Sequence, residues 1–524
     1  MATMMTPGVY IVEKDAFPNS VVEVATAVPA FIGYSAKHLN KEQSLRYKPR
    51  RVTSLAEYAL FFGGAPKLQG QFTISDGPPE ELDEGRELAV TAGPMDPVVK
   101  EGGKAYYLAR NEASRRYHMY YGLRSFYQNG GGPCYIVSVG SYEDKLDPGD
   151  FEKGIEALLR EQEPTMVVIP DAVLLPAADC QSIQQAAIGH CAKMQSRFAI
   201  LDVFRGYEAR HLPLAAGQRD CVADFRELST DDAKYCAAYY PWIDTTVVSG
   251  ADPELTYKAF DDAGVAALQE LLTAELITDE TPEAKKTLIE SLIADASNPD
   301  AQTGPTNDGL LATSGNFQDL MKQMRAEVNR LPPSATMAGV YSRVDNSRGV
   351  WKAPANVALS GVSKPAVNIT HDEQEDLNVT VSGKSVNAIR SFVGEGTLVW
   401  GARTLDGNSL DWRYIQVRRT MIMLEQSIKL ASKAYVFEAN DANTWVTMKS
   451  IFRNFLTGIW KRGGLAGASA EAAFSVHVGL GETMTSEDIL EGIMRVTVLV
   501  APTRPAEFIE ITFQQKMQES GGGG

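Results

Sequence analysis

The stretch TPGVYIVEKDAFPNSVVEVATAVPAFIGYS, residues 6–35, places two short β-prone runs ahead of a longer apolar run. The short runs, residues 9–14 and 21–26, are separated by Asp15, Pro18 and Asn19, which are residue types that turn the chain. Each run has the length of a modest strand, and neither has an obvious partner nearby. Because an unpaired strand edge invites pairing with another chain, the location of their partners decides how the fold is completed.

Length and composition indicate a folded chain of several domains. At 524 residues the sequence exceeds what one core usually organises, and we expect roughly two to four domains. Hydrophobic residues make up 44% and charged residues 22%, and no apolar run approaches the roughly 18 residues of a membrane span. The N-terminus lacks a basic segment followed by an apolar one, so we expect no signal peptide and synthesis in the cytoplasm.

Charge and motif content exclude several classes of function. The formal net charge of −16 argues against a nucleic-acid partner, because binding phosphates requires a concentrated basic surface. Five cysteines lie at spacings that match neither a disulfide framework nor a zinc site, and we expect buried thiols. The glycine-rich stretch at residues 463–469 follows a predicted helix, whereas a dinucleotide fingerprint follows a strand. We therefore expect no cofactor, no metal site and no catalytic residue.

Strand-like and helix-like runs alternate from about residue 30 to residue 246. Continuous apolar strands separated by helices are typical of a mainly parallel α/β sheet that is covered on both faces. The predicted strands are residues 27–35, 133–140, 165–172 and 197–204, and the predicted helices are residues 114–132, 147–164 and 180–195.

Two aspartates follow strands in this region. Asp171 and Asp202 lie just past predicted strand ends, where α/β enzymes place catalytic groups. An aspartate at a strand end is also an ordinary turn or helix-cap residue, and we favour that interpretation.

The last third of the chain has a different pattern. Apolar residues spaced by three and four predict two long amphipathic helices, near residues 417–431 and 445–459. Strand-like runs follow them, and the run AEFIEITFQQKM, residues 506–517, alternates as a half-buried strand does. The chain therefore carries β-prone runs near both ends. If such a run pairs with the sheet of a neighbouring copy, the chain polymerises by β-augmentation.

Several stretches of the sequence resemble contractile tail sheath proteins, which occur in myophage tails, R-type pyocins and extracellular contractile injection particles. The N-terminal stretch at residues 7–35 is similar to the start of these proteins, and residues 126–140 of the middle region look similar too. Further matching stretches lie at residues 338–359, 386–405, 412–428 and 498–515. The resemblance does not cover two regions rich in Gly, Pro or acidic residues, residues 67–104 and 251–330.

The resemblance implies a structural protein and not an enzyme. Sheath subunits polymerise helically as stacked rings around an inner tube, and the sheath contracts to drive the tube through a target envelope. Expected partners are further copies of the chain, possible paralogous sheath subunits, the inner tube protein, and baseplate and terminator or cap proteins, without direct membrane insertion. The expected final location is a phage virion or a phage tail-like particle, which can be released from the cell.

The resemblance also implies a fold and a set of contact residues. We expect a multi-domain α/β protein whose inner α/β domain is built from both chain termini, with β-strand arms exchanged between subunits. The expected parts are a β arm at 1–26, a middle α/β domain at 27–250 with a surface insertion at 67–104, an acidic helical insertion at 251–330, an inner domain with the C-terminal arm at 331–515, and a flexible tail at 516–524.

Three groups of residues are candidates for contacts. For strand exchange between subunits they are Val9, Tyr10, Ile11, Val12, Val22, Val24, Phe508, Ile509, Ile511 and Phe513. For the tube contact they are Thr485, Ser486, Glu487, Asp488 and Glu491, whose acids could instead serve only as helix caps. For anchoring within the inner domain, by an ion pair and an aromatic side chain, they are Arg343, Asp345, Arg348 and Trp351. The alternative function is a cytosolic α/β enzyme with a helical and β appendix.

Overall fold

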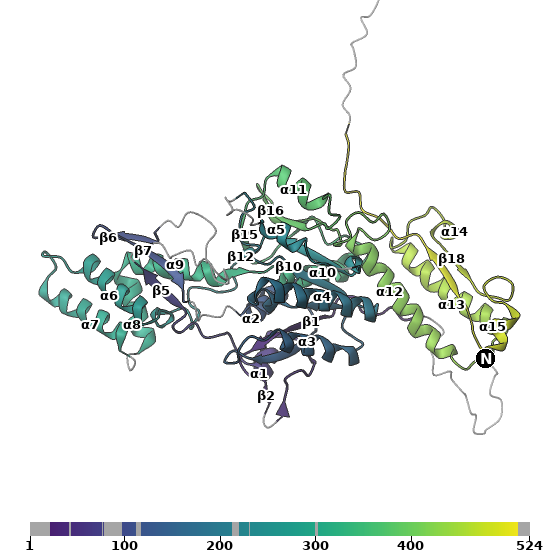
Figure 1. Ribbon diagram of the computed structural model, residues 1–524, viewed down its shortest axis with the longest axis horizontal. Coiled ribbons are helices and arrows are strands. Elements are labelled where there is room, and N and C mark those ends of the chain that lie inside the picture. The colour runs from purple at the N-terminus through teal and green to yellow at the C-terminus, as the bar shows by residue number, and fades with distance from the viewer. Residues whose placement is uncertain are drawn as a thin grey trace, which may run out of the picture.

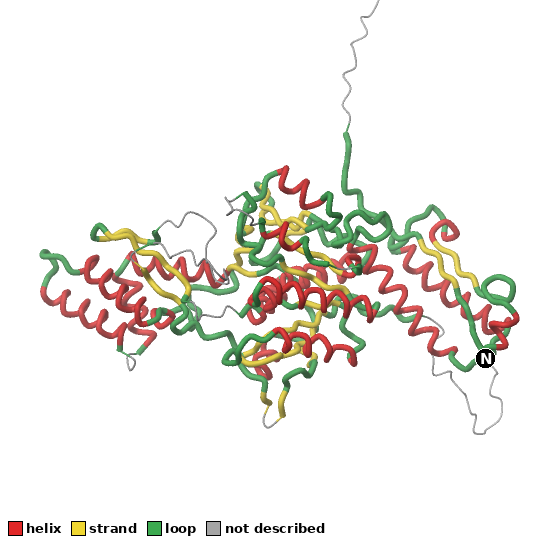
Figure 2. The backbone as a smooth tube through the Cα atoms, viewed as in Figure 1, coloured by secondary structure: helices red, strands yellow, loops and turns green. Residues whose placement is uncertain are grey.

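The computed structural model of the chain describes residues 21–40, 43–75, 77, 97–111, 117–211, 219–229, 231–298 and 302–511. Its described part is elongated, and three bodies follow one another along the long axis (Figure 1). A mainly helical subdomain lies at one end, a sheet with helices on both faces lies in the middle, and two long helices with a small sheet lie at the other end (Figure 2).

The middle body is built on a sheet whose strands come from both halves of the chain. The strands are β1 (Pro29–Ser35), β4 (Arg50–Val52), β8 (Cys134–Ser141), β9 (Met166–Val168), β10 (Phe198–Asp202), β11 (Cys236–Tyr240), β14 (Val357–Ala358), β16 (Asn387–Phe392) and β17 (Gly396–Trp400). Their order is β14-β17-β16-β11-β10-β9-β1-β8-β4. Every neighbouring pair from β8 to β16 is parallel, and antiparallel pairs occur only at the two ends. The predicted mainly parallel sheet is confirmed.

Helices cover both faces of this sheet. Successive residues of β1 point to opposite faces, so Ala30 and Ile32 join one hydrophobic cluster and Phe31 joins the other. The helices packed on the first cluster are α3 (Pro148–Ala157), α4 (Ala177–Met194), α5 (Cys221–Phe225) and α11 (His371–Asn378). Those on the second are α1 (Leu55–Phe62), α2 (Met119–Gln128) and α10 (Ser334–Arg348). All five cysteines are buried and unpaired, which confirms the expectation of buried thiols.

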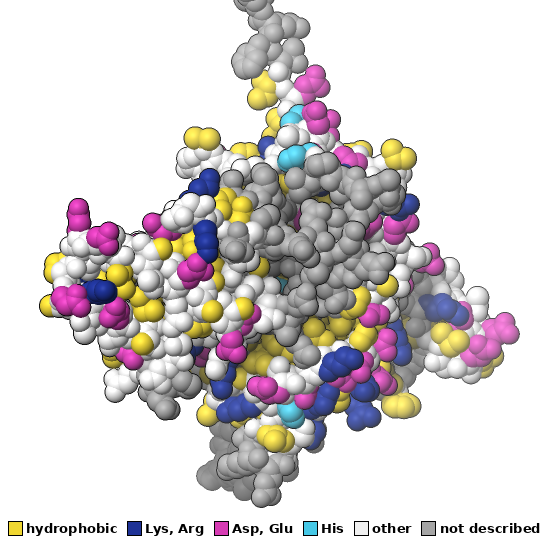
Figure 3. Space-filling model, turned by 60° about the vertical axis from the view of Figure 1, so that its left-hand side comes forward, with side chains coloured by type: hydrophobic (Ala, Val, Ile, Leu, Met, Phe, Trp, Pro, Cys, Tyr) yellow, Lys and Arg dark blue, Asp and Glu magenta, His cyan; other side chains and the backbone are white. Residues whose placement is uncertain are grey.

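The subdomain at one end combines parts of both Gly-, Pro- or acid-rich regions. Its three-stranded sheet, β5 (Phe72–Ser75), β7 (Lys104–Arg110) and β6 (Val99–Glu101), packs on α6 (Asp262–Leu276) in a cluster shared with α7 (Glu283–Ser297), α8 (Thr303–Thr313) and α9 (Gly315–Asn329). The sequence predicted two separate insertions, at residues 67–104 and 251–330. In the structure, Phe72 of the first and Leu268 of the second lie in the same hydrophobic cluster. Figure 3 brings this end of the molecule forward and shows acidic side chains scattered among hydrophobic ones.

A third body contains the two long helices that the sequence predicts. These are α12 (Ile415–Ser432) and α13 (Ala442–Lys461), and their apolar faces meet over β18 (Phe474–His477) and β19 (Thr497–Val500). Residues Val21 and Val24 pack against the same cluster from the other end of the chain. The remaining elements are β2 (Leu39–Asn40), β3 (Gln43–Ser44), β12 (Ile243–Thr245), β13 (Arg330–Leu331), β15 (Val362–Pro365), α14 (Ala470–Ala473) and α15 (Ser486–Leu490).

Three expectations about segments near the chain ends need correction or fall outside the structure. Residues 21–26 were expected to form a strand, but they form an extended segment outside the named strands. The described part of the expected C-terminal strand, residues 506–511, also has no strand in the single chain. In both cases no strand among the described residues pairs with this backbone. Residues 9–14 and Phe513 are outside the described residues.

The boundary expected at residue 331 does not separate two sheets. Helix α10 and strands β14, β16 and β17 all follow this position, yet they complete the middle body. The physical reason is that β16 pairs in parallel with β11, which extends the earlier sheet. The third body begins only with α12.

Asp171 and Asp202 both cap helices that are distant from them in the sequence. The Asp171 carboxylate accepts hydrogen bonds from the backbone N–H groups of His118 (2.6 Å) and Met119 (3.0 Å) at the start of α2. It also accepts one from the backbone N–H of Tyr34 in β1 (2.9 Å). Asp202 accepts the backbone N–H of Ser334 at 2.7 Å and also its hydroxyl group, at the start of α10. The helix-cap interpretation is therefore confirmed. Burial raises the pKa of Asp171 to about 6 and that of Asp202 to about 7.

We predict that Asp202→Asn changes how stability depends on pH. The folded-state pKa of Asp202, about 7, lies above its ordinary value of 3.8, so folding retains a proton that the unfolded chain loses, and stability falls as pH rises through this window. Asparagine does not titrate: its amide oxygen still accepts the Ser334 backbone N–H, and its NH2 group can donate to the Ser334 hydroxyl in place of the bond that the carboxylate accepts. As the pH rises from about 3.8 to about 7, the free energy of unfolding of the wild type should therefore fall by about 2–4 kcal/mol relative to that of the variant.

The measurement is urea unfolding of the unassembled chain across this pH range. Asp319→Asn is the matched control, because Asp319 lies at an exposed position on α9. A difference between Asp202→Asn and wild type that stays constant with pH would contradict the prediction.

Candidate assembly interface

The N-terminal segment reaches the third body as an extended chain fixed at several points. The backbone N–H of Val24 donates to the hydroxyl of Ser427 at 3.1 Å, and the carbonyl of Thr26 accepts from Arg419 at 3.0 Å. The Thr26 hydroxyl donates to Asp345 at 2.7 Å. These hydrogen bonds fix residues 24–26 to α12 and α10.

A buried ion pair forms the centre of this attachment. Arg419 and Asp345 approach to 2.6 Å, with their side chains only 4% and 3% exposed. A second hydrogen bond of 3.0 Å makes the contact bidentate, and the guanidinium lies over the ring of Tyr341, 4.7 Å from its centroid. A buried charge pair is tolerated when hydrogen bonds satisfy both groups, and here they also join α10 of the middle body to α12 of the third.

The C-terminal segment has a second attachment, at Glu507. Its carboxylate accepts hydrogen bonds from Arg403 at 2.7 and 2.9 Å, from Asn378 at 2.8 Å and from Tyr414 at 3.0 Å. Burial alone would raise the pKa of Glu507, but the bonds from Arg403 and Asn378 outweigh it and hold the pKa below its ordinary value. The chain is therefore fixed to the middle body up to this residue.

Beyond Glu507 the described chain leaves the body. Phe508, Ile509 and Ile511 are 74%, 78% and 69% exposed, and the segment extends away from the sheet (Figure 1). Adjacent large apolar side chains with this exposure are unusual in a chain that has no further contact to make.

A small sheet in the third body has only two strands among the described residues. It consists of β18 and β19, which pair antiparallel over residues 474–477 and 497–500. Leu499 on β19 is 59% exposed. Because two strands alone make a marginal sheet in water, added strands would stabilise it.

Helix α15 carries the residues expected to contact a tube, and the structure divides them into two groups. Thr485 and Asp488 form a reciprocal capping box, and Asp488 also pairs with Arg495 at 3.0 Å. The backbone N–H of Thr485 and the Arg495 side chain lower the pKa of Asp488. The Asp488 carboxylate therefore has its partners within this copy, whereas Glu487 and Glu491 are exposed.

The anchoring candidates lie at the end of α10 and beyond it. Asp345 makes the ion pair with Arg419, which the sequence did not identify as its partner. Arg343 donates instead to the carbonyl of Ala358 at 2.5 Å, and Arg348 is exposed. The Trp351 ring lies under the guanidinium of Arg462 at 5.1 Å, at the edge of the third body.

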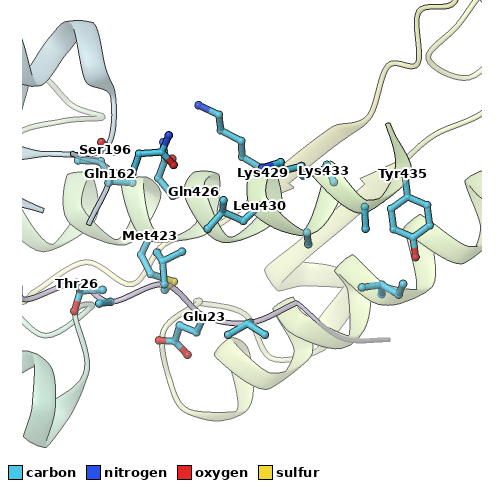
Figure 4. Close-up of a pocket in the computed structure, with 18 of the residues that line it drawn as sticks. Glu23, Thr26, Gln162, Ser196, Met423, Gln426, Lys429, Leu430, Lys433 and Tyr435 are labelled. Carbon is cyan, nitrogen blue, oxygen red and sulfur yellow. The ribbon is translucent and has the colours of Figure 1, made fainter. Parts of the chain in front are cut away.

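An open groove of about 1620 Å³ lies between the middle and third bodies. Residues 22–26 form one side, and Met423, Lys429 and Leu430 of α12 form another (Figure 4). The N-terminal segment is thus itself a wall of the groove, so its attachment at Arg419 fixes the shape of this space.

Neither a metal site nor a membrane span emerges from the described residues. Within the described ranges, no group of three or more His, Cys, Asp or Glu side chains is placed to hold a metal ion. The helices of those same ranges include none that combines the length and apolarity needed to cross a bilayer.

Comparison with known families identifies the architecture. The model of the phage tail sheath protein central domain matches residues 148–405, and that of the phage tail sheath C-terminal domain matches residues 408–516. The chain belongs to the phage tail sheath family. The junction between the two matches falls just before α12, where the third body begins.

Solved sheath structures are similar over nearly the whole chain. The sheath of an extracellular contractile injection system, the PVC sheath complex in its contracted state, is 26% identical with a TM-score of 0.57 and covers 98% of this chain and 99% of its own. The helical sheath of the anti-feeding prophage in its contracted state is 27% identical with a TM-score of 0.55, covering 98% and 100%. The tail sheath protein of Vibrio phage KVP40 is 23% identical over 297 residues, 50% of this chain and 42% of that protein. The chain thus matches less than half of this phage protein's length.

We predict that the buried ion pair of this sheath-family chain stabilises it only as a pair. Asp345→Leu should cost about 3–5 kcal/mol, because it leaves the Arg419 charge buried without its partner. Adding Arg419→Met should restore much of this loss, since an apolar pair of similar size is often as stable as a buried ion pair. Urea unfolding of the unassembled chains measures both.

The exposed pair of Arg462 and Glu23 provides the control. Their side chains are 51% and 34% exposed, and Glu23→Gln should cost about 0–1 kcal/mol. A double variant at residues 345 and 419 that is no more stable than Asp345→Leu alone would refute the ion-pair account.

Proposed function

We propose that the chain is the structural subunit of a contractile sheath, polymerising helically around an inner tube and contracting to drive the tube through a target envelope. The observation that carries this proposal is the exposed apolar segment at residues 508–511, in a chain that also has an incomplete two-stranded sheet. Membership of the sheath family supports it over the alternative of an α/β enzyme.

The proposed link between subunits is strand exchange. Residues 508–513 of one copy would pair with an edge of β18 or β19 in another, and N-terminal residues 9–12 would contribute a further strand. Each backbone hydrogen bond contributes only about 1 kcal/mol net, so one arm supplies a weak link. A lattice in which every copy gives and receives arms would sum many such links.

The two attachments suit this role because they limit where each arm can move. Thr26 is fixed through Arg419 and Asp345, and Glu507 is fixed through Arg403. Flexing would then be confined to the segments beyond these residues, so that arms could stay paired while the bodies rotate. A body held by buried ion pairs would resist being pulled apart during contraction.

The same proposal assigns partners and location. Besides further copies and possible paralogous subunits, the partners are an inner tube protein, a baseplate, on which assembly starts, and a terminator or cap. Solved complexes of similar proteins include the anti-feeding prophage baseplate. Assembly would take place in the cytoplasm, and contraction would draw on the better packing of a second arrangement of subunits, without a catalytic step.

We predict that removing residues 508–524 abolishes polymerisation. The cut lies beyond Glu507, so the body keeps its hydrogen bonds to Arg403 and should unfold at the wild-type temperature. Negative-stain microscopy and sedimentation measure assembly. Removal of residues 516–524 alone is the control and should leave sheaths intact. Sheaths of normal length from the 508–524 deletion would rule out the C-terminal arm as a link.

We predict that Glu487→Lys with Glu491→Lys prevents assembly on tubes and leaves tube-free sheaths intact. Both acids are exposed, and this contact requires them to face basic side chains of the tube, so reversing their charge would replace attraction with repulsion. Asp488 is kept because it caps α15. Glu290→Lys on α7 is the control, since this exposed acid lies in the distant helical subdomain. Equal occupancy of tubes by the double variant and the wild type would exclude α15 as the contact.

A further inference from the structure

A fully buried arginine just before β10 has uncharged hydrogen-bond partners. The guanidinium of Arg197 donates to the backbone carbonyls of Leu158 at 2.8 Å and Pro164 at 3.1 Å. It also donates to the carbonyl of Glu161 and to Nε2 of His190, the latter at 2.6 Å. Buried charges are usually paired with an opposite charge, so Arg197 depends on these uncharged acceptors instead.

The hydrogen bond to His190 exists only while that imidazole is neutral. A guanidinium carries donors and no acceptor, so Nε2 of His190 must accept the bond and cannot hold a proton. His190 lies near the C-terminal end of α4 and is only 6% exposed. Protonation would place two cations in contact where water screens them poorly. Acid therefore removes this bond and replaces it with repulsion.

The charged groups around His190 oppose its protonation. Within the described ranges, the groups whose charge acts on it are Arg197 and Lys193, and both are cations. The elements packed against α4, which include α3 and β10, add no carboxylate to this set. Its neighbour Cys191 is a neutral thiol, since burial raises the pKa of that group to about 12. Burial and the charges of Arg197 and Lys193 lower the pKa of His190 to about 4, so the imidazole is neutral at pH 7.

The stretch that Arg197 binds leads directly to a second attachment of the N-terminal segment. Residues 158–164 are followed by Thr165, whose hydroxyl donates to the carbonyl of Thr26 at 2.8 Å and accepts from the N–H of Val28 at 2.9 Å. The backbone N–H of Thr165 donates to the carbonyl of Val28 at 2.8 Å. Residues 26–28 are therefore held by Thr165 as well as by the buried ion pair at α10 and α12.

The two partners of the His190 bond are held by different parts of the middle body. The guanidinium of Arg197 is bound to the carbonyls of residues 158–164, whereas α4 carries the imidazole. A buried ring has little room to turn without displacing its neighbours. Two cations that separate would therefore move residues 158–164 away from α4.

We propose that the bond between His190 and Arg197 is an acid-sensitive switch, which fixes residues 158–165 to α4 at neutral pH and loosens them, together with the attachment of residues 26–28, when His190 is protonated. The switch belongs to the single subunit and does not depend on the proposed sheath function. It would make the origin of the N-terminal segment less firmly held in acid than at neutral pH.

The direct test is hydrogen exchange of the unassembled full-length chain between pH 6 and pH 4, read by mass spectrometry and corrected for the intrinsic pH dependence of exchange. The reporting amides are those of Glu161, Thr165 and Val28, which donate hydrogen bonds in this region. Their protection should fall on the order of 40-fold over this range, because the released imidazole titrates near 6.5 and the bound one near 4.

Two substitutions at position 190 separate the switch from general acid unfolding. His190→Gln keeps an acceptor for Arg197 that does not titrate, so protection of residues 158–165 should persist at pH 4. His190→Leu removes the acceptor at every pH, so the same residues should already exchange faster than in the wild type at pH 6. His371→Gln is the control and should match the wild type, since the side chain of His371 is 81% exposed on α11.

Three results would overturn the proposal. The first is a wild type whose residues 158–165 keep their protection at pH 4, and the second is an equal loss of protection in the wild type and His190→Gln. The third is a loss spread evenly over the chain, including α7, because acid would then act on the whole fold. These measurements use the unassembled chain, so none of them bears on the proposed sheath function.

Discussion

The proposed assembly depends on backbone groups that the described part of one copy leaves without partner strands. Past Glu507 the backbone carries β-prone residues into solvent, and β18 and β19 form a sheet of only two strands. Exposed strand edges invite pairing with other chains, so a protein either protects them or uses them. In the proposed polymer the same groups would form the links between subunits.

The attachments at Asp345 and Glu507 divide each subunit into a stable body and its projecting segments. Both carboxylates are held by arginine side chains that are almost fully buried, Arg419 and Arg403. Pairs of this kind are costly to break, so forces applied to the arms would act on the firmest contacts of the body. In the proposed lattice each link between subunits could then be weak, while many links together would hold the assembly as it rearranges.

Local patterns in the sequence were enough to predict the parallel sheet and the two long helices, because continuous apolar strands and three-four spacing report directly on burial. The same patterns could not predict that β16 joins β11, since that pairing brings together residues far apart in the chain. The sheet of the middle body therefore continues past the boundary expected at residue 331. Residues 21–26 form no strand in a single copy, because β propensity does not supply a partner, and their pairing with a neighbouring copy stays a prediction.

The sequence was enough to pick out the acidic residues of the candidate tube contact, but it could not show their hydrogen-bond partners or their exposure. The acids of α15 were identified from sequence, but only the structure showed that Asp488 is committed to Thr485 and Arg495 while Glu487 remains exposed. The Arg419 partner of Asp345 was missed because 74 residues separate the two.

A map of the assembled polymer, traced through residues 497–513, tests the central claim most directly. The account requires that the backbone of residues 508–513 in one subunit be hydrogen-bonded to β18 or β19 of another. A trace in which those residues fold back onto the body of their own subunit would contradict it.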